Sequence, residues 1–298
     1  MPETGVKFWR FGLLGYPLGH SLSPRLHTAA LQESGLRGEY RLFAVTPAAQ
    51  DQLTNLLESI RRGKVDGLNV TIPYKQTVVP LLDKLTPRAA AIGAVNTIAL
   101  RHGLLEGDNT DGPGFLADLV RKAGWPAEKP QPNQDRLPLA LVLGAGGSAR
   151  AVAHALGGLG WHVWLAARRL EQARSLALSL RPHISGLIHY LTCEALPVLL
   201  SAVRPAFDLL VNTTPLGMAP EVAASPWPEN LDFPRSAFVY DLVYNPPETA
   251  WLRHARAAGL RAVNGSGMLI EQAALSFELW TGRPAPRVAM AQAVETNA

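Results

Sequence analysis

Short apolar runs alternate along the chain with segments whose apolar residues recur at helical spacing. Runs typical of strands cover residues 10–15, 39–45, 66–72 and 95–100. Helical stretches follow Pro24 and cover residues 48–62 and 78–92. Six further strand-like runs begin at Leu139, His162, Leu187, Phe207, Phe238 and Arg261. Because strands alternate with helices throughout, we predict an α/β protein whose later part is a doubly wound sheet.

The size of the chain predicts two domains. With 298 residues, of which 47% are hydrophobic, it can bury two separate cores. Residues 125–138 are rich in proline and polar side chains, and residues 219–234 form a similar segment. Both segments predict surface loops within the second domain. The sequence does not indicate what the 125–138 loop does.

Composition excludes several classes of protein. The net charge is +4, but the arginines are scattered without interleaved aromatic residues, so we expect a small anionic substrate and no nucleic-acid partner. No apolar run approaches the roughly 20 residues that span a bilayer, and glycines and a proline interrupt the first apolar stretch. The single cysteine, Cys193, excludes an internal disulfide. We therefore expect a cytoplasmic protein that makes no contact with a membrane.

A glycine-rich turn joins an apolar strand to a helix in residues 139–150, LALVLGAGGSAR. In dinucleotide-binding folds the first glycine, here Gly144, permits the tight turn, and the second, here Gly146, lets the backbone approach a pyrophosphate. The helix that begins there adds N–H donors and the positive end of its dipole. The pattern predicts a dinucleotide site, although an ordinary strand-to-helix turn can have the same glycines.

The next strand indicates which dinucleotide is bound. NAD-binding proteins usually place an acidic residue about 20 residues past the first glycine, where it holds the ribose 2′-hydroxyl. Arg168 and Arg169 occupy that place here, and guanidinium groups bind a 2′-phosphate through charge-assisted hydrogen bonds. We therefore predict NADP as the cofactor. The alternative is a solvated arginine pair at a helix start, with Glu171 as a poorly placed acid.

Polar side chains gather at the ends of the early strands, where open α/β sheets bind ligands. Reduction of a ketone by a nicotinamide requires a proton donor, and a lysine beside a carboxylate can fill that role. Lys75 and Asp111 are the candidates for this pair. The hydroxyls of Ser21 and Ser23 could bind a substrate carboxylate. Each residue has a structural alternative, because Ser23 or Asp111 could cap a helix and Lys75 could be solvated.

Eight short motifs follow one another along the chain. The first four are Ser21-Leu22-Ser23-Pro24, Asn69-Val70-Thr71 with Pro73 and Lys75, Gly93-Ala94-Val95-Asn96-Thr97, and Asn109-Thr110-Asp111-Gly112. The others are the turn at residues 144–150, Asn212-Thr213-Thr214-Pro215-Leu216-Gly217-Met218, Asp241-Leu242-Val243-Tyr244-Asn245-Pro246, and Gly267-Met268-Leu269 followed by Gln272. In this order they resemble the motifs of the shikimate dehydrogenase family. The resemblance covers nearly the whole chain and is far more specific than any single motif.

The resemblance implies a role for each motif. The substrate carboxylate would be bound by Ser21, Ser23 and Tyr244, and the ring hydroxyls by Asn69, Thr71, Asn96 and Gln272. The catalytic pair would be Lys75 and Asp111. Beside the turn glycine Gly144, the pyrophosphate would be faced by Gly146, Gly147 and Ser148, and the 2′-phosphate by Arg168 and Arg169. The adenosine and nicotinamide portions would meet Thr213, Met218, Gly265 and Met268.

The family resemblance also implies an activity and a domain layout. Members reduce 3-dehydroshikimate reversibly to shikimate with NADPH, in the shikimate pathway toward chorismate and the aromatic amino acids. A substrate-binding and catalytic α/β domain would comprise residues 1–111 with 265–298, and an NADP-binding Rossmann domain residues 112–264. We expect a monomer or a homodimer. The family often has Asn-Arg-Thr where this chain has Ala167-Arg168-Arg169.

Two other functions remain open. One is a quinate/shikimate dehydrogenase of the same build, which needs room for an additional hydroxyl. The other is a sensor that binds a dinucleotide or metabolite without converting it; its signature would be loss of the proton donor, yet Lys75 and Asp111 are both present. We expect no metal site, because His20 and His27 have no third ligand nearby in the sequence.

Overall fold

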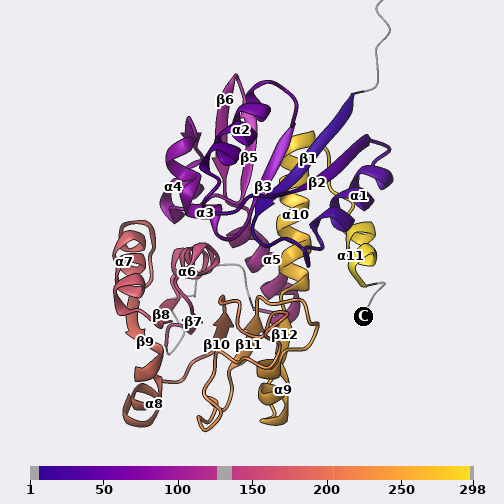
Figure 1. Cartoon of the computed structure of the whole chain (residues 1–298). Helices are drawn as coiled ribbons and strands as arrows, with labels where there is room; N and C mark the ends of the chain where they lie inside the picture. The colour runs from indigo at the N-terminus through magenta and orange to yellow at the C-terminus, as the bar shows by residue number, and fades with distance from the viewer. Residues whose placement is uncertain (1–6, 126–135, 204, 296–298) are drawn as a thin grey trace, which may run out of the picture. The chain divides into compact units, whose positions relative to one another are not determined.

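The computed structural model describes residues 7–125, 136–203 and 205–295. The chain forms two compact units, Met1–Thr110 with Ile270–Ala298, and Asp111–Leu269. Each contains a six-stranded sheet (Figure 1). Most of the predicted 125–138 loop, residues 126–135, lies outside the described residues. The assignment of substrate to one unit and cofactor to the other stays a prediction.

The sheet of the first unit is mixed. Its strands are β1 (Phe8–Gly15), β2 (Arg37–Ala44), β3 (Gly67–Val70), β4 (Lys84–Leu85), β5 (Thr97–Arg101) and β6 (Leu104–Asp108). They are arranged in the order β2-β1-β3-β5-β6-β4. β1 runs parallel to β2 and β3, whereas β5 is antiparallel to both β3 and β6. Consequently the start of β5 lies beside the end of β3, with Thr97 opposite Asn69.

Helices pack on this sheet through buried apolar side chains. They are α1 (Ser23–Glu33), α2 (Gln50–Arg61), α3 (Tyr74–Thr77), α4 (Pro87–Ile92), α10 (Ser266–Thr281) and α11 (Arg287–Glu295). The buried leucines of α2 recur at helical spacing and pack with strand residues such as Leu68 and Ile98. Phe11 of β1 stacks on Trp280 of α10, with ring centroids 4.6 Å apart.

The predicted helix over residues 78–92 is wrong. The segment contains the short 3-10 helix η1 (Val79–Leu81), strand β4 and then α4. Pro80 and Pro87 lack the N–H that a continuous helix needs, and each is tolerated only in a first helical turn. Strand β6 was not predicted either. It follows a tight turn at His102 and Gly103, whose φ angles are 51° and 77°.

The sheet of the second unit is parallel throughout, as predicted. Its strands are β7 (Leu139–Leu143), β8 (His162–Ala167), β9 (Ile188–Thr192), β10 (Leu209–Asn212), β11 (Phe238–Asp241) and β12 (Ala262–Asn264). The order β12-β11-β10-β7-β8-β9 is that of a doubly wound nucleotide-binding sheet. Strand order reverses between β10 and β7, and such a reversal is the usual position of a ligand crevice.

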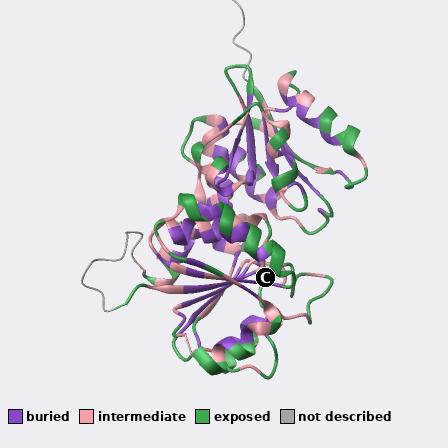
Figure 2. Cartoon of the chain, turned by 90° about the vertical axis from the view of Figure 1, so that its left-hand side faces the viewer, coloured by how far each residue is buried: buried purple, intermediate pink, exposed green. Residues whose placement is uncertain are grey.

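Helices lie on both faces of the second sheet. They are α5 (Asp111–Ala123), α6 (Gly147–Gly158), α7 (Leu170–Leu180), α8 (Leu196–Val198) and α9 (Ala250–Ala257), with short turns η2 (Arg181–His183), η3 (Cys193–Ala195) and η4 (Leu199–Val203). Along β7, Ala140 and Val142 pack with the core of α5, α6 and α7, whereas Leu141 and Leu143 pack with that of α8 and α9. The strands are therefore buried, while the helices expose their outer faces (Figure 2). None of the helices in the described parts is long and apolar enough to cross a membrane.

Candidate active site

The predicted substrate residues of the first unit gather at one edge of its sheet. Asn69 lies in β3, Thr71 follows its end, and Asn96 immediately precedes β5. Because β3 and β5 are antiparallel, this end of β3 and this start of β5 are neighbours. Residues far apart in the sequence thus meet at one edge of the sheet.

A buried hydrogen-bond network joins three of the predicted residues. The Asn96 Nδ2 donates to Gln272 Oε1 of α10 at 3.3 Å and to Thr110 Oγ1 at 2.9 Å. The Asn69 Nδ2 donates to the Asn96 carbonyl at 3.2 Å and to Ser276 Oγ at 2.9 Å. The structure therefore brings Asn69, Asn96 and Gln272 together, and it adds hydroxyl groups to which the sequence assigned no role.

Ser21 and Ser23 lie at the start of α1. Leu22 is the N-cap of this helix, and no side chain makes a capping bond there. The hydroxyl of Ser21 accepts a hydrogen bond from the backbone N–H of Ser23 at 3.3 Å. Ser23 itself is buried as the first helical residue, next to Pro24. The alternative interpretation of Ser23 as a capping residue is therefore wrong.

Backbone hydrogen bonds fix the segment that carries Lys75. The N–H of Thr71 donates to the Leu14 carbonyl of β1 at 2.8 Å, and that of Val95 donates to the Lys75 carbonyl at 2.7 Å. The phenol of Tyr74 donates to the Val45 carbonyl at 2.8 Å. Lys75 itself is half-buried in the four-residue helix α3. The hydrogen bonds of Thr71, Tyr74 and Val95 therefore fix the backbone on which its side chain stands.

Asp111 is buried as the first residue of α5. It belongs to the second unit and Lys75 to the first, so their catalytic pairing stays a prediction. In the first unit, the segment just before it is anchored by Asp108, which accepts hydrogen bonds from Thr86 Oγ1 at 2.7 Å and from the Arg88 guanidinium. The side chain of Asn109 donates to the Ala94 carbonyl at 2.9 Å.

The glycine-rich turn has the geometry that close approach to a phosphate requires. Gly144 has φ +117°, and a Cβ there would lie 2.5 Å from Thr213 Oγ1, so a side chain would be strained and would clash. At Gly146, the N-cap of α6, a Cβ would meet nothing within 4 Å. This helix therefore begins beside open space, and its first N–H groups can receive an anion.

Arg168 and Arg169 follow the end of β8, and both are exposed. Arg169 is the N-cap of α7, and Glu171 in the first turn of that helix lies 3.8 Å from Arg174. Among the described residues, neither member of the Arg168–Arg169 pair forms an ion pair. Both guanidinium groups are thus available to a bound anion.

Asp241 supports the two strand ends that carry Thr213, Met218 and Tyr244. At the end of β11, its carboxylate accepts hydrogen bonds from Asn212 Nδ2 at 2.8 Å and Thr249 Oγ1 at 2.7 Å. Burial raises the pKa of Asp241 to about 6, because the charged form is desolvated. Asp241 belongs to one of the sequence motifs, but no role was predicted for it.

The second unit also holds the predicted Gly265 and Met268 close to its sheet. A Cβ at Gly265 would lie 2.3 Å from the Leu242 carbonyl oxygen, so only glycine fits. At Gly267 a Cβ would meet the carboxylate of Asp118, which accepts a hydrogen bond from Tyr240 at 2.6 Å. Met268 is buried beside them. These close approaches explain why residues 265 and 267, on either side of the first residue of α10, are glycines.

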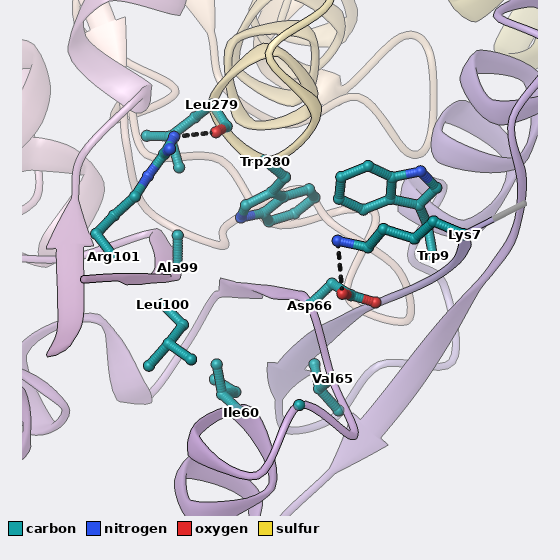
Figure 3. A pocket seen from close by; sticks show the side chains of 11 residues that line it. Lys7, Trp9, Ile60, Val65, Asp66, Ala99, Leu100, Arg101, Leu279 and Trp280 are labelled. Carbon is teal, nitrogen blue, oxygen red and sulfur yellow. Dashed lines mark hydrogen bonds and ion pairs between the residues drawn. The ribbon is translucent and has the colours of Figure 1, made fainter. Parts of the chain in front are cut away.

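A pocket of about 200 Å³ lies elsewhere in the first unit, where β1 and β3 begin (Figure 3). Lys7 lies over the ring of Trp9 and pairs with Asp66 at 3.0 Å. Arg101 donates to the Leu279 carbonyl. Both cations of this pocket are therefore engaged, and none of the predicted site residues lines it.

Comparison with known proteins identifies relatives along the full chain. Residues 13–98 match the shikimate dehydrogenase substrate binding domain, and residues 265–295 the shikimate 5′-dehydrogenase C-terminal domain. Shikimate dehydrogenase (NADP(+)) of Salinibacter ruber is 40% identical over 96% of each chain. Shikimate 5-dehydrogenase of Thermus thermophilus, solved with NADP(H) and shikimate, is 38% identical with a TM-score of 0.79 and covers 96% of this chain and 98% of its own. Quinate dehydrogenase of Corynebacterium glutamicum, solved with NAD, is 30% identical with a TM-score of 0.82, over 97% of this chain and 100% of its own.

Proposed function

Because the chain belongs to the family of NADP-dependent shikimate dehydrogenases, we propose that it reduces 3-dehydroshikimate reversibly to shikimate with NADPH. The observation that carries this function is the full-length identity of about 40% to curated NADP-dependent members, together with the likeness to a structure that binds both ligands. The finer assignments, of individual residues and of each unit to one ligand, are also our proposals.

The first unit binds the substrate. Ser21, Ser23 and, from the second unit, Tyr244 bind its carboxylate, and the ring hydroxyls are bound by Asn69, Thr71, Asn96 and Gln272. The hydroxyl of Ser23 supports this assignment because it does not cap α1. The three amides support it because one hydrogen-bonded network links them at the strand edge. Hydroxyl and amide groups provide both donors and acceptors, which a polyhydroxylated ring with a carboxylate requires.

The second unit fits NADP. The open space beside Gly146 and the start of α6 suit a pyrophosphate, which Gly144, Gly147 and Ser148 help to enclose. Arg168 and Arg169 bind the 2′-phosphate, while the remaining contacts come from Thr213, Met218, Gly265 and Met268. When bound, NADPH supplies the hydride that reduces the carbonyl carbon.

Lys75 and Asp111 perform the proton transfer. Lys75 donates a proton to the carbonyl oxygen, so that the ketone becomes a secondary alcohol, and it takes the proton back when shikimate is oxidised. Asp111 holds and polarises the lysine ammonium. Lys75→Ala is therefore expected to lower kcat by roughly 10²- to 10⁴-fold with a much smaller change in substrate affinity. Lys84→Ala is the matched control, because Lys84 forms an ion pair with Glu106 at 3.1 Å on the surface.

Steady-state kinetics of both variants and of Asp111→Asn test these roles. Since Lys75 and Asp111 act as a unit, the double variant should lose far less than the product of the two single losses. A folded Lys75→Ala enzyme with normal kcat would show that another group donates the proton.

Absorbance of the reduced nicotinamide tests the reaction itself, with shikimate and quinate each offered with NADP and NAD. We expect the highest kcat/KM for shikimate with NADP. The likeness to a quinate dehydrogenase makes quinate oxidation the second candidate activity. If quinate is oxidised as efficiently as shikimate, the protein is a quinate/shikimate dehydrogenase. If neither substrate is oxidised with either cofactor, the protein only binds such ligands.

A further inference from the structure

Ser276 lies at the centre of the buried network beside the proposed substrate site. It is one turn after Gln272 on α10 and has no exposed surface. Its hydroxyl donates to the Gln272 carbonyl at 3.0 Å and lies 2.8 Å from Thr97 Oγ1. It also accepts from Asn69 Nδ2 at 2.9 Å. One hydroxyl thus connects α10 to Asn69 of β3 and to Thr97 of β5, the residue after Asn96.

The orientation of the Asn69 amide is determined by these contacts. Its nitrogen faces the Asn96 carbonyl, which can only accept a hydrogen bond, and so the amide cannot be flipped without losing that bond. On the other side, Tyr40 donates from its hydroxyl to Asn69 Oδ1 at 2.9 Å. The bond to Ser276 is shorter than those of Asn69 Nδ2 to the Asn96 carbonyl and to Thr97 Oγ1, at 3.2 and 3.3 Å.

Asn96 is connected to Ser276 through Thr97 and Thr110. Its Oδ1 accepts from the Thr110 N–H at 2.8 Å and from Thr97 Oγ1 at 3.0 Å. Thr110 Oγ1 donates to the Gln272 carbonyl at 3.0 Å and lies 3.3 Å from Ser276 Oγ. Loss of the Ser276 hydroxyl therefore removes a partner of the Asn69 amide and of the two threonines that bind Asn96, all of which are buried.

We propose that Ser276 is a positioning residue for substrate binding, which holds the amides of Asn69 and Asn96 in the orientation that receives the ring hydroxyls. The proposal rests on the proposed function. Ser276 does not touch substrate in this role, because its effect passes through Asn69 and Asn96. Tyr40 supports Asn69 from the opposite side of the amide.

The variant Ser276→Ala removes the hydroxyl and leaves the helix otherwise intact. Its KM for shikimate should rise about 5- to 30-fold, the effect of one buried hydrogen bond, while kcat changes less than about threefold and the KM for NADP stays unchanged. Thr281→Val is the matched control: on the same helix its hydroxyl donates to the carbonyl four residues earlier, at 2.7 Å, but it contacts no substrate residue. Ser276→Ala should lose more thermal stability than Thr281→Val, because its partners are buried, and only Ser276→Ala should change the KM for shikimate.

A double-mutant cycle with Asn69→Ala separates positioning from general destabilisation. If Ser276 acts through the amide, Ser276→Ala should raise the KM for shikimate far less when Asn69 is already alanine. Should Ser276→Ala prove unstable, Tyr40→Phe tests the same network, because it removes the hydroxyl that donates to Asn69 Oδ1. It too should raise the KM for shikimate and leave the KM for NADP unchanged.

The outcomes distinguish this proposal from the proposed function. A wild-type enzyme that does not oxidise shikimate overturns the function and, with it, the positioning role. A wild-type enzyme that does oxidise shikimate, with Ser276→Ala kinetically equal to Thr281→Val, overturns the positioning role alone. An equal rise in KM whether residue 69 is asparagine or alanine also overturns it, because Ser276 would then act independently of the amide.

Discussion

Individual side chains of the candidate site are held by the protein before any ligand arrives. Asn69 has bonds to both ends of its amide, and Asp108 accepts from both Thr86 and Arg88. Groups that are already oriented lose little conformational entropy on binding, which favours affinity and correct geometry. At this scale, single substitutions should separate binding from stability.

Ser23→Ala separates these two effects at the start of α1. Because Ser23 makes no capping bond, the free energy of unfolding should change by less than about 0.5 kcal/mol, compared with about 1 kcal/mol for a lost cap. A lost charge-assisted bond to the substrate carboxylate should raise the KM for shikimate by about 10- to 150-fold. Thermal melts and kinetics, with Ser34→Ala at the other end of α1 as control, measure both. A loss of stability with an unchanged KM would show that Ser23 stabilises the helix and does not bind the substrate.

His27 predicts a loss of stability in mild acid. The ring is fully buried, stacks on Tyr40 at 4.3 Å, and its pKa falls to about 3 because burial disfavours the charged form. Below pH 6.5, the pKa of an unperturbed histidine, the unfolded chain binds a proton that the folded protein cannot accept. The free energy of unfolding is therefore highest above pH 6.5 and decreases progressively as the pH falls below that value. Between pH 7 and pH 5 the loss is about 2 kcal/mol.

His27→Phe should remove this dependence while the aromatic stacking is kept. Denaturant unfolding at pH 7 and pH 5 measures the difference, and His183→Phe, at an exposed position, serves as the control. The His27 variant should lose about 2 kcal/mol less than the wild type over this range. If both proteins lose the same amount, groups other than His27 cause the acid sensitivity.

At the scale of elements, the ends of parallel strands determine where ligands can bind. Loops after β7, β8 and β10 leave the sheet at one edge, and they carry Gly144, the Arg168–Arg169 pair and Thr213. Strand order reverses between β7 and β10, and such a reversal is where doubly wound sheets usually bind a ligand. The start of α6 adds an anion-binding helix end.

The arginine pair at the end of β8 predicts a preference for NADP. Replacing Arg168 and Arg169 together with glutamine should lower kcat/KM for NADP about 100-fold or more, since two charge-assisted bonds to the phosphate are lost. Kinetics with NAD should barely change, because NAD lacks the 2′-phosphate. Arg174→Gln is the control, as Arg174 lies on α7 beside Glu171. A double variant that retains its NADP preference would mean that the phosphate is bound elsewhere.

At the scale of the whole molecule, each compact unit has a core of its own. The first unit packs α2 against its mixed sheet, and the second unit encloses a parallel sheet between two helical layers. Helix α10 is the exception, because its first residues belong to the second unit and the rest to the first.

Hydrogen exchange measured by mass spectrometry tests the assignment of ligands to units. Bound NADP should slow exchange in peptides that cover residues 144–150 and 213–218, because these backbone N–H groups and loops would become ordered or covered. Shikimate should slow exchange in residues 20–26 and 69–75. NADP protection confined to the peptides of the first unit would contradict the assignment.

Much of the fold and of the site follows from local sequence. Short apolar runs and the glycine-rich turn predict the parallel sheet of the second unit, because a buried strand and a tight turn each demand particular residue types at adjacent positions. The polar motifs at strand ends likewise mark candidate ligand residues. The segment 78–92 is misleading, since helix spacing there is broken by Pro80 and Pro87, and β4 pairs only with the unpredicted β6.

Only the tertiary structure decided which residues support the site. Ser276, Tyr40 and His27 stand in ordinary helical or strand patterns, and a serine in an apolar helix carries no local signal of its partner. Asn69 and Ser276 are separated by 207 positions, and their hydrogen bond exists because α10 returns to the sheet of the first unit. Hydrogen-bond partners and burial are properties of the packed chain, whereas turn geometry and apolar spacing are properties of neighbouring residues.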